Sequence, residues 1–296
     1  EIDIAVDLGG HAQTCQLSIF ARRCAPLQVN FLGYPGTMGA AYMDYLFADS
    51  TIIPESCRSY YSEKISYLPS YLPGDSQRAV AEKVYSRGEF GLPQTGFVFC
   101  CFNDPFKITP SVFDAWMRIL KHVNGSVLWL PESHGSATEN LRKEASLRGI
   151  APERLVFAKR MPLLEEHRAR HRLADLFIDT IPYNAHATAS DALWVGLPVL
   201  TCTTEAFAGR VAASLLNAIN LPELVTSTLV EYEAMAVALA NNPERLAQIK
   251  KKLELNRLTT LLFDTKRYTK YIEDAYAQMY ERYQADLPPD HIYVAA

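Results

Sequence analysis

From Gly96 onward, strand-like apolar segments alternate with amphipathic ones, and this alternation constrains the fold more than any other feature of the sequence. "GFVFCCF" (96–102) has the length of a buried strand, and "SVFDAWMRILKHV" (111–123) repeats apolar residues at helical spacing, with Ser111 as the expected N-cap. The pattern continues with strands expected at 126–131, 153–159, 176–180, 198–202 and near 223–226, and with helices at 139–149, 163–174, 188–195, 209–219, 231–241 and 243–258. Strands that alternate with helices favour a parallel sheet covered on both faces, so we predict a Rossmann-like domain.

The first ninety residues have a different pattern, in which turns rich in glycine and proline separate short strand candidates at 2–8, 27–33, 44–49 and 64–69. We interpret them as the C-terminal part of a second α/β sheet whose earlier strands precede this chain. A long amphipathic segment near the end, with Asp264 as its expected N-cap, predicts a closing helix that crosses back to that sheet. The predicted boundaries are 1–75 for the partial first domain, 76–95 for a linker, 96–260 for the Rossmann-like domain, 261–285 for the closing helix and 286–296 for a tail.

Composition excludes several classes of protein. Of 296 residues, 49% are hydrophobic and 21% charged, which is typical of a globular chain. The net charge of −4, without a basic stripe, argues against a nucleic acid partner. The longest apolar runs are far shorter than the roughly 20 residues that a membrane-spanning helix needs. The six cysteines form no Cys-x-x-Cys pair, so we expect reduced thiols and a cytoplasmic protein.

Ligands of open α/β sheets bind at the carboxyl ends of strands, and three loops at such positions carry polar residues. Lys107 follows the strand at 96–102, where its ammonium can reach a phosphate; an ordinary surface lysine is the alternative. His167 and His171 are four residues apart and share a helix face, as do Arg168 and Arg172. Without a His-Glu-x-x-His pattern, a solvated charged helix is favoured there over a zinc site.

The third loop lies in "DTIPYNAHATASDALW" (179–194), where the chain turns through Asn184 and His186 into a helix expected to begin near Thr188. The free N–H groups and the positive dipole end of such a helix form an anion site, to which Thr188 can add its hydroxyl. Asp191, one turn further, can accept hydrogen bonds from ribose hydroxyls. Ordinary capping of the helix by Asn184 or Thr188 is the alternative.

Familiar catalytic and phosphate-binding motifs do not occur in the sequence. It contains no G-x-G-x-x-G, Walker A, G-x-S-x-G or kinase signature. It also contains no Asp-x-Asp, so neither a metal site nor the usual metal-dependent binding of a sugar nucleotide is indicated. A diphosphate in these loops would be neutralised by lysine, histidine and the helix dipole, with no further cofactor.

Six stretches together resemble the catalytic region of protein O-GlcNAc transferases, in order and over nearly the whole chain: "DLGGH", "CAPLQVNFLGYPGTMGAAYMDYLFAD", "FNDPFKITPSVFDAWMRIL", "EEHRARHRLAD", "NAHATASDALWVGLPVLT" and "KRYTKYIEDAYAQMYERY". The resemblance implies a GT-B architecture, in which two Rossmann-like domains face a cleft and residues 96–260 bind the nucleotide sugar. It implies a metal-independent, inverting transfer of N-acetylglucosamine from UDP-GlcNAc to Ser or Thr hydroxyls of proteins. It also implies a tetratricopeptide-repeat region and the catalytic base upstream of this chain.

The resemblance assigns roles to particular residues. Lys107 matches the lysine that contacts the UDP phosphates, so we expect it to stabilise the leaving group together with the amides at 186–188. His167 matches the histidine beside the uracil, and Arg170 the arginine three positions on. His186, Thr188 and Asp191 match a His-Thr-Thr…Asp motif, in which the first two hold the diphosphate and the aspartate binds ribose.

Three positions depart from the animal members of the family. Asp104 stands where they have glutamine, and a carboxylate near a diphosphate is electrostatically unfavourable. Ala187 replaces the first threonine of the motif, which removes a hydroxyl and keeps the backbone N–H. His11, in "GGH", stands where they have tyrosine, and we consider it an acceptor-side candidate.

Two alternatives stay open at this point. A protein O-fucosyltransferase using GDP-fucose shares the "GYP" and "ITP" segments, although a run of threonines replaces "NAHATASD" in its motif. The second alternative is a non-catalytic scaffold that binds a UDP-sugar, and the departures at Ala187 and Asp104 favour this alternative.

Overall fold

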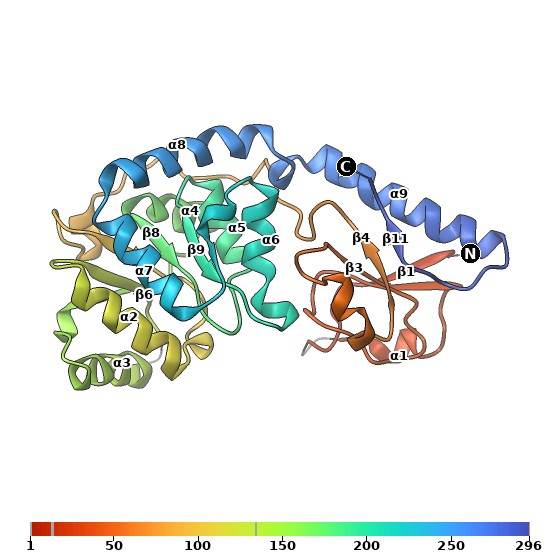
Figure 1. Ribbon diagram of the computed structural model, residues 1–296, viewed down its shortest axis with the longest axis horizontal. Coiled ribbons are helices and arrows are strands. Elements are labelled where there is room, and N and C mark those ends of the chain that lie inside the picture. The colour runs from red at the N-terminus through yellow and green to blue at the C-terminus, as the bar shows by residue number, and fades with distance from the viewer. Residues whose placement is uncertain (1, 13–14, 134, 296) are drawn as a thin grey trace. The chain divides into compact units, whose positions relative to one another are not determined.

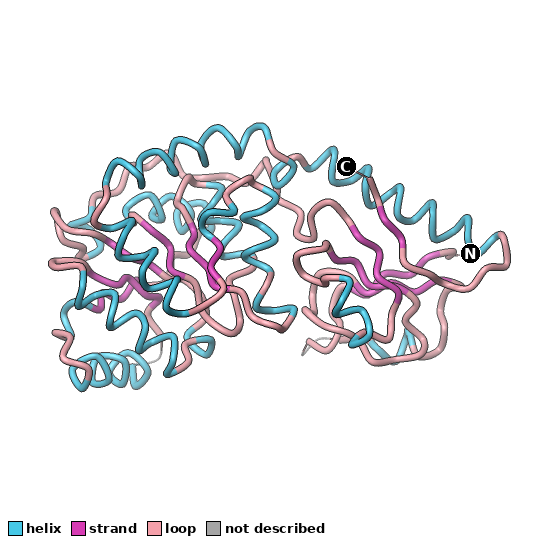
Figure 2. The backbone as a smooth tube through the Cα atoms, viewed as in Figure 1, coloured by secondary structure: helices cyan, strands magenta, loops and turns pink. Residues whose placement is uncertain are grey.

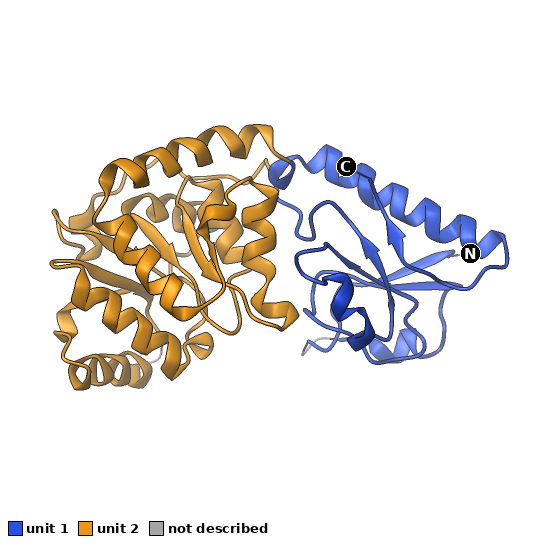
Figure 3. Cartoon of the chain, in the orientation of Figure 1, with its two compact units in different colours: residues 1–74, 261–296 blue, residues 75–260 orange. Residues whose placement is uncertain are grey.

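The computed structural model describes residues 2–12, 15–133 and 135–295, which form two compact units. Unit 1 combines Glu1–Gly74 with Leu261–Ala296, and unit 2 is Asp75–Thr260 (Figure 3). Residues 76–95, for which the sequence predicted a linker, belong to unit 2. Each unit contains its own parallel β-sheet (Figure 2).

Unit 2 contains a six-stranded sheet in the order β10-β9-β8-β5-β6-β7, with every neighbouring pair parallel. Its strands are β5 (Val98–Cys100), β6 (Val127–Pro131), β7 (Leu155–Ala158), β8 (Leu176–Ile178), β9 (Val199–Cys202) and β10 (Val225–Thr226). The helices between and after them are α2 (Pro110–His122), α3 (Gly135–Leu147), α4 (Leu164–Arg170), α5 (Ala187–Trp194), α6 (Val211–Ala218), α7 (Leu229–Ala240) and α8 (Pro243–Thr259), as Figure 1 shows. The predicted alternation of strands and helices is confirmed.

The strand order reverses between β5 and β8. From β5 the chain adds β6 and β7 on one side, and from β8 it adds β9 and β10 on the other. Because parallel crossovers are right-handed, the connections through α2 and α5 cover opposite faces of the sheet. At such a point the loops after the two strands diverge and leave a crevice, where ligands of open α/β sheets bind.

The helix α2 begins one residue earlier than expected, and its cap is a different residue. The side chain of Thr109, not that of Ser111, accepts the hydrogen bond from the Val112 amide, and Pro110 occupies the first turn. The sequence assigned the cap to the residue after the proline. Proline favours the first position of a helix, so the N-cap is the residue before the proline. An N-cap residue has an extended backbone conformation, and Thr109 has this conformation.

Unit 1 contains five parallel strands in the order β1-β2-β3-β4-β11: β1 (Ile4–Asp7), β2 (Leu27–Asn30), β3 (Tyr45–Ala48), β4 (Lys64–Tyr67) and β11 (Ile292–Tyr293). The helix α9 (Thr265–Gln284) packs on this sheet, and Asp264 caps it by accepting a hydrogen bond from the Arg267 amide, as predicted. Their shared core includes Val29 and Phe47 from the sheet and Ala275 and Met279 from the helix.

Two elements of unit 1, and the end of α4 in unit 2, differ from the expectations. A short helix α1 (Leu17–Phe20) precedes β2, and β11 adds a strand where only a tail was expected. The α4 helix ends at Arg170 and continues as a 3-10 turn over His171–Leu173. Among the residues that the structure describes, no helix is long and apolar enough to cross a membrane.

Candidate functional site

Polar side chains gather at the carboxyl ends of β5, β8 and β9, on both sides of the point where the strand order reverses. The loop after β5 contacts the loop after β8, because the Lys107 ammonium donates a 2.9 Å hydrogen bond to the carbonyl of Asn184. The loop after β8 contacts the loop after β9, because the Asn184 amide donates to the carbonyl of Ala208. Three segments that are distant in sequence thus form one continuous surface.

Lys107 ends a 3-10 turn (Pro105–Lys107) whose N-cap is Asp104. The Asp104 carboxylate accepts from the Phe106 amide, so this residue serves as a local cap. The Lys107 ammonium lies 3.9 Å from the centre of the Tyr183 ring. Burial lowers the pKa of Lys107, and the negative charges of Asp179 and Asp104 oppose that effect. The site therefore holds a half-buried cation at the end of the 3-10 turn after β5.

The helix α5 begins at Ala187, and no side chain caps its N-terminus within the described residues. Its first amides are therefore available as donors, and the helix dipole favours an anion there. Thr188 lies in this first turn, but its hydroxyl donates to the Asn103 side chain. Neither Asn184 nor Thr188 caps the helix, because no described side chain accepts a hydrogen bond from its first amides. The Asn184 side-chain amide donates to the carbonyls of Thr180 and Cys202.

His186 precedes α5 and stacks on Tyr183, with ring centres 5.1 Å apart. Burial, and secondarily Lys107, lowers the pKa of His186 to about 4. The imidazole is thus neutral at pH 7 in this structure, where it adds no positive charge to the site. The positive potential comes from Lys107 and the helix, while His186 can act as a neutral hydrogen-bonding group.

His167 and Arg170 interact directly on α4. A guanidinium N–H of Arg170 donates to Nδ1 of His167 at 2.6 Å, and another donates to the carbonyl of Lys159. Because arginine stays protonated, Nδ1 of His167 must be the acceptor, which leaves the proton on Nε2. Burial lowers the pKa of His167 to about 3, so the ring is neutral and offers one N–H donor. Arg170 is 2% exposed and lies over Phe102, so it positions His167 and has no open face of its own.

His171 lies beside His167, as the four-residue spacing predicted, with ring centres 4.8 Å apart. Its Nδ1 is 2.8 Å from the His167 carbonyl, and burial lowers its pKa to about 4. Within residues 2–12, 15–133 and 135–295, no group of three or more His, Cys, Asp or Glu side chains is arranged to hold a metal ion.

Asp191 makes two ion pairs that the sequence did not suggest. Its Oδ1 accepts from Arg78 at 2.8 Å and from Arg168 at 3.0 Å. Arg168 is therefore not on a solvated face, since its side chain is only 15% exposed. Both contacts go to one carboxylate oxygen, which leaves Oδ2 as the atom through which Asp191 can accept from a ribose hydroxyl.

The remaining candidates are Ala187 and His11. Ala187 is exposed as the first residue of α5, where its backbone N–H is kept. His11 belongs to unit 1, where its Nε2 is 3.1 Å from the Met38 carbonyl and its ring meets Tyr34 edge-on. The structure thus brings Lys107, His186 and Thr188 together and places His167, Arg170 and Asp191 in the same unit, whereas His11 lies in the other.

Sequence reasoning missed several residues that organise this site. Asn103 and Asp179 connect the loops after β5 and β8, and Arg78 and Arg168 hold Asp191. A usable signal existed for the first two, because each is a polar residue directly after a buried strand. Arg78 carried no such signal, since its partner is 113 positions away in the sequence.

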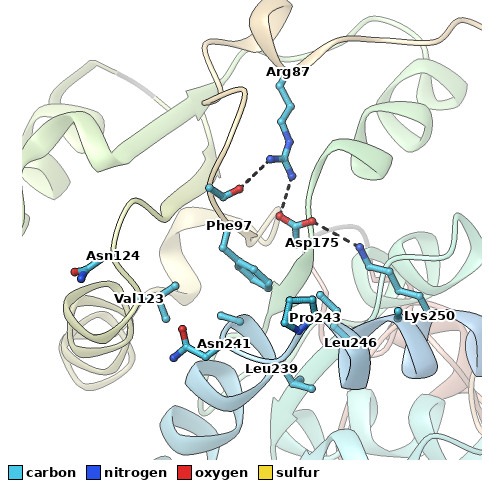
Figure 4. Close-up of a pocket in the computed structure, with 13 residues that line it drawn as sticks. Arg87, Phe97, Val123, Asn124, Asp175, Leu239, Asn241, Pro243, Leu246 and Lys250 are labelled. Atoms are coloured by element: carbon cyan, nitrogen blue, oxygen red, sulfur yellow. Dashed lines mark hydrogen bonds and ion pairs between the residues drawn. The ribbon is translucent and has the colours of Figure 1, made fainter.

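A pocket of about 440 Å³ lies at the opposite edge of the same sheet, before β5 and β8 (Figure 4). Arg87 and Lys250 both approach the carboxylate of Asp175 there, at 2.8 and 3.7 Å. Asp175 also accepts from the Val98 amide, and Arg87 donates to the Gly96 carbonyl. The charged groups of this pocket therefore bind one another and the amino ends of the strands.

Comparison with known proteins relates the chain to one enzyme family. The model described as glycosyl transferase family 41 matches residues 1–85 and 73–272. The probable UDP-N-acetylglucosamine–peptide N-acetylglucosaminyltransferase SEC of Arabidopsis thaliana is 36% identical over 301 residues, covering 99% of this chain and 31% of the plant protein. The UDP-N-acetylglucosamine–peptide N-acetylglucosaminyltransferase of Caenorhabditis elegans is 29% identical over 403 residues, covering 98% of this chain and 35% of the worm protein.

A solved structure is also similar. A mutant of the Thermobaculum terrenum O-GlcNAc transferase superimposes with a TM-score of 0.85 at 33% identity, over 94% of this chain and 53% of that chain. The chain spans about a third of the length of the curated relatives that it matches.

Proposed function

Because this chain belongs to glycosyl transferase family 41, we propose that it contributes the donor-binding part of an enzyme that transfers N-acetylglucosamine from UDP-GlcNAc to Ser or Thr hydroxyls of proteins. Its two parallel-sheet α/β units are those of a GT-B glycosyltransferase, with the first domain present in part. The relatives are named as UDP-N-acetylglucosamine–peptide N-acetylglucosaminyltransferases, which supports the choice of donor and acceptor.

One observation carries the proposal. The half-buried ammonium of Lys107 and the uncapped N-terminus of α5 lie on adjoining loops at the reversal of strand order. That is where an open α/β sheet binds a nucleotide, and both groups attract a pyrophosphate. In the proposed site, His167 lies beside the uracil and Asp191 binds the ribose through Oδ2.

The proposed reaction is an in-line attack of the acceptor hydroxyl on the anomeric carbon, with inversion. A bond forms between the acceptor oxygen and C1 while the C1–O bond to the diphosphate breaks; the electron pair leaves with UDP, and the hydroxyl proton passes to the base that the resemblance implies. Negative charge therefore develops on the leaving phosphate, next to Lys107 and the amides at 186–188. Preorganised donors at that position lower the barrier, and removing one typically costs on the order of 10²–10³ in rate. We propose that this cation and these amides replace a metal ion.

The test is a sugar-transfer assay on the complete protein with Lys107→Ala. We expect the transfer rate to fall by about 10²–10³-fold, because one donor to the leaving group is lost. The matched control is Lys143→Ala on α3, which removes an exposed lysine from the same unit and should leave the rate unchanged. Activity of Lys107→Ala equal to that of the wild type would refute the assignment.

Two further arms of this assay test the finer parts of the proposal. Addition of EDTA should leave the rate unchanged, and a loss of activity that Mg²⁺ restores would contradict metal independence. GDP-fucose as donor should give no transfer, whereas transfer from it alone would establish the fucosyl alternative. Tight UDP binding without transfer from either donor would indicate a scaffold.

All six cysteines are free, of which Cys100, Cys101 and Cys202 are buried. This supports the proposal of a reducing, cytoplasmic environment for the reaction.

A further inference from the structure

Asp179 follows β8 and is a carboxylate without any exposed surface. Four hydrogen bonds satisfy it. Its Oδ1 accepts from the amides of Thr180 and Ala185 at 2.8 and 2.7 Å and from the Asn103 side chain at 3.0 Å. Its Oδ2 accepts from the Thr201 hydroxyl at 2.7 Å. The donors come from the loop after β5, the loop after β8 and β9 itself.

These bonds determine the path of the loop between β8 and α5. The amides at both ends of this loop, Thr180 and Ala185, converge on the same carboxylate oxygen, so the loop closes around Asp179. Within this closed loop, the Asn184 carbonyl points toward the Lys107 ammonium and accepts its hydrogen bond. The loop closes at Ala185, two residues before the first residue of α5. The groups proposed to hold the pyrophosphate are thus placed by one buried residue that does not touch it.

Asn103 extends the same network to the first turn of α5. Its amide group donates to Asp179 and to the Thr180 hydroxyl, and its Oδ1 accepts from the Thr188 hydroxyl. Asn103 therefore joins the loop after β5, which carries Lys107, directly to α5, and the carboxylate of Asp179 joins it to the loop after β8.

Asp179 also acts on the charge of Lys107. Burial lowers the pKa of this lysine, and the nearby charge of Asp179 is the strongest effect that opposes it. The other titratable groups around Asp179 are Cys101, Cys202 and Tyr232, whose pKa values are all raised by burial, so they are uncharged at pH 7. His186 is neutral as well.

We propose that Asp179 is the positioning residue of the pyrophosphate site: its buried carboxylate shapes the loop 179–187, which places the Asn184 carbonyl that accepts from Lys107, and its negative charge favours the ammonium. The inference rests on the proposed function. An asparagine could accept the same backbone amides, so geometry alone does not require a charge at this position. A buried carboxylate is costly without compensation, and the charge of Asp179 favours the ammonium of Lys107, which opposes the effect of burial on this lysine.

The first test is Asp179→Asn in the complete protein, with Asp175→Asn as the matched control. Asp175 lies before β8 at the other edge of the sheet, where it also accepts a backbone amide. We expect Asp179→Asn to lower kcat at least tenfold and to move the alkaline limb of the pH–rate profile to lower pH, because Lys107 loses its charge partner. Asp175→Asn should leave that limb in place. A wild-type kcat and pH profile for Asp179→Asn would overturn the proposal.

A second variant covers the case in which Asp179→Asn does not fold. Thr201→Val keeps the shape of the β9 side chain and removes the donor to Oδ2, so the pKa of Asp179 should rise. The acid limb of the profile should then move to higher pH, and an unchanged limb would count against the proposal.

A third measurement separates this inference from the proposed function. The pKa of the Lys107 amine can be measured by NMR titration of the complete protein without any donor. This pKa should be lower in Asp179→Asn than in the wild type, and the control Asp175→Asn should have the wild-type value. An equal value in wild type and Asp179→Asn would overturn the inference. A wild type that neither binds UDP nor transfers sugar would instead refute the proposed function, while the NMR result still decides the role of Asp179.

Discussion

Burial determines the charge of the titratable side chains around the candidate site. It lowers the pKa of His171 and His186 to about 4 and that of His167 to about 3, and it raises the pKa of Asp179 to about 6. At pH 7 the site therefore combines neutral imidazoles with a charged carboxylate and the ammonium of Lys107. Single residues thus act here through hydrogen bonds and one cation, and the histidines add no charge.

These shifts predict how stability depends on pH. A histidine whose pKa is lowered binds fewer protons in the folded than in the unfolded protein between about pH 6.5 and 4, so acidification through this window destabilises the fold. Asp179 acts in the opposite direction between about pH 6 and 3.8, because its folded pKa is raised. Three histidines oppose one carboxylate, so we expect a net loss of stability as the pH falls below 6.5.

The fully buried His171 allows this to be measured. From pH 7.5 to 5.0 its contribution to the free energy of unfolding should fall by about 2 kcal/mol, because the pKa of this imidazole is about 4 in the folded and about 6.5 in the unfolded protein. Urea denaturation at pH 7.5 and 5.0 should therefore show a smaller pH-dependent loss for His171→Phe than for the wild type, by about that amount. The same pH dependence in both proteins would contradict the assignment of His171 as a buried neutral ring.

At the scale of elements, α2 and α5 show two uses of a helix N-terminus. Thr109 caps α2, and its hydroxyl also donates to the Ile181 carbonyl, which joins the start of this helix to the loop after β8. No side chain caps α5 within the described residues, so its amides stay available. A capped helix stabilises the fold, whereas an uncapped one at the edge of the sheet is suited to an anion.

Substitutions in the first turn of α2 can distinguish the observed cap from the expected one. Thr109→Ala should reduce the free energy of unfolding by about 1 kcal/mol, since the Val112 amide loses its acceptor. Ser111→Ala should have a smaller effect, and Thr109→Ser should stay close to the wild type. Thermal unfolding of the three variants provides the measurement, and a larger loss for Ser111→Ala would contradict the structure.

At the scale of the whole molecule, unit 1 is assembled from both ends of the chain. The sheet formed by residues before Gly74 is completed by β11 and covered by α9, both of which follow residue 260. Unit 2 is continuous in sequence and contains all the candidate donor-binding residues, whereas His11 belongs to unit 1. The two units therefore depend on different parts of the chain.

A pair of alanines on α9 tests the packing in unit 1. Ala275 is fully buried in the core shared with the sheet, and Ala277 is exposed two residues later. Ala275→Asp should destabilise unit 1 by several kcal/mol, because it places an unpaired charge in an apolar core, and Ala277→Asp should be close to neutral. Limited proteolysis should then cleave only the first variant within residues 1–74, and equal resistance would argue against this packing.

The continuity of unit 2 leads to a prediction about the donor. A fragment of residues 75–260 should bind UDP, because Lys107, α5, His167 and Asp191 are all inside it, but it should not transfer sugar. Titration calorimetry on the fragment, with its Lys107→Ala variant as control, provides the measurement. A folded fragment without affinity for UDP would show that the nucleotide site needs residues of unit 1.

The sequence by itself determined the Rossmann-like alternation in unit 2, the closing helix with its Asp264 cap, and the loops in which Lys107 and the α5 N-terminus lie. Such features depend on neighbouring residues, within one strand, one helical turn or one cap, and their spacing is visible in the sequence. Only the tertiary structure decided that β5 lies beside β8, that Asp179 joins Asn103 from 76 positions away, and that Arg78 pairs with Asp191. These contacts depend on the order of strands in the sheet and on complete burial, which local periodicity does not encode.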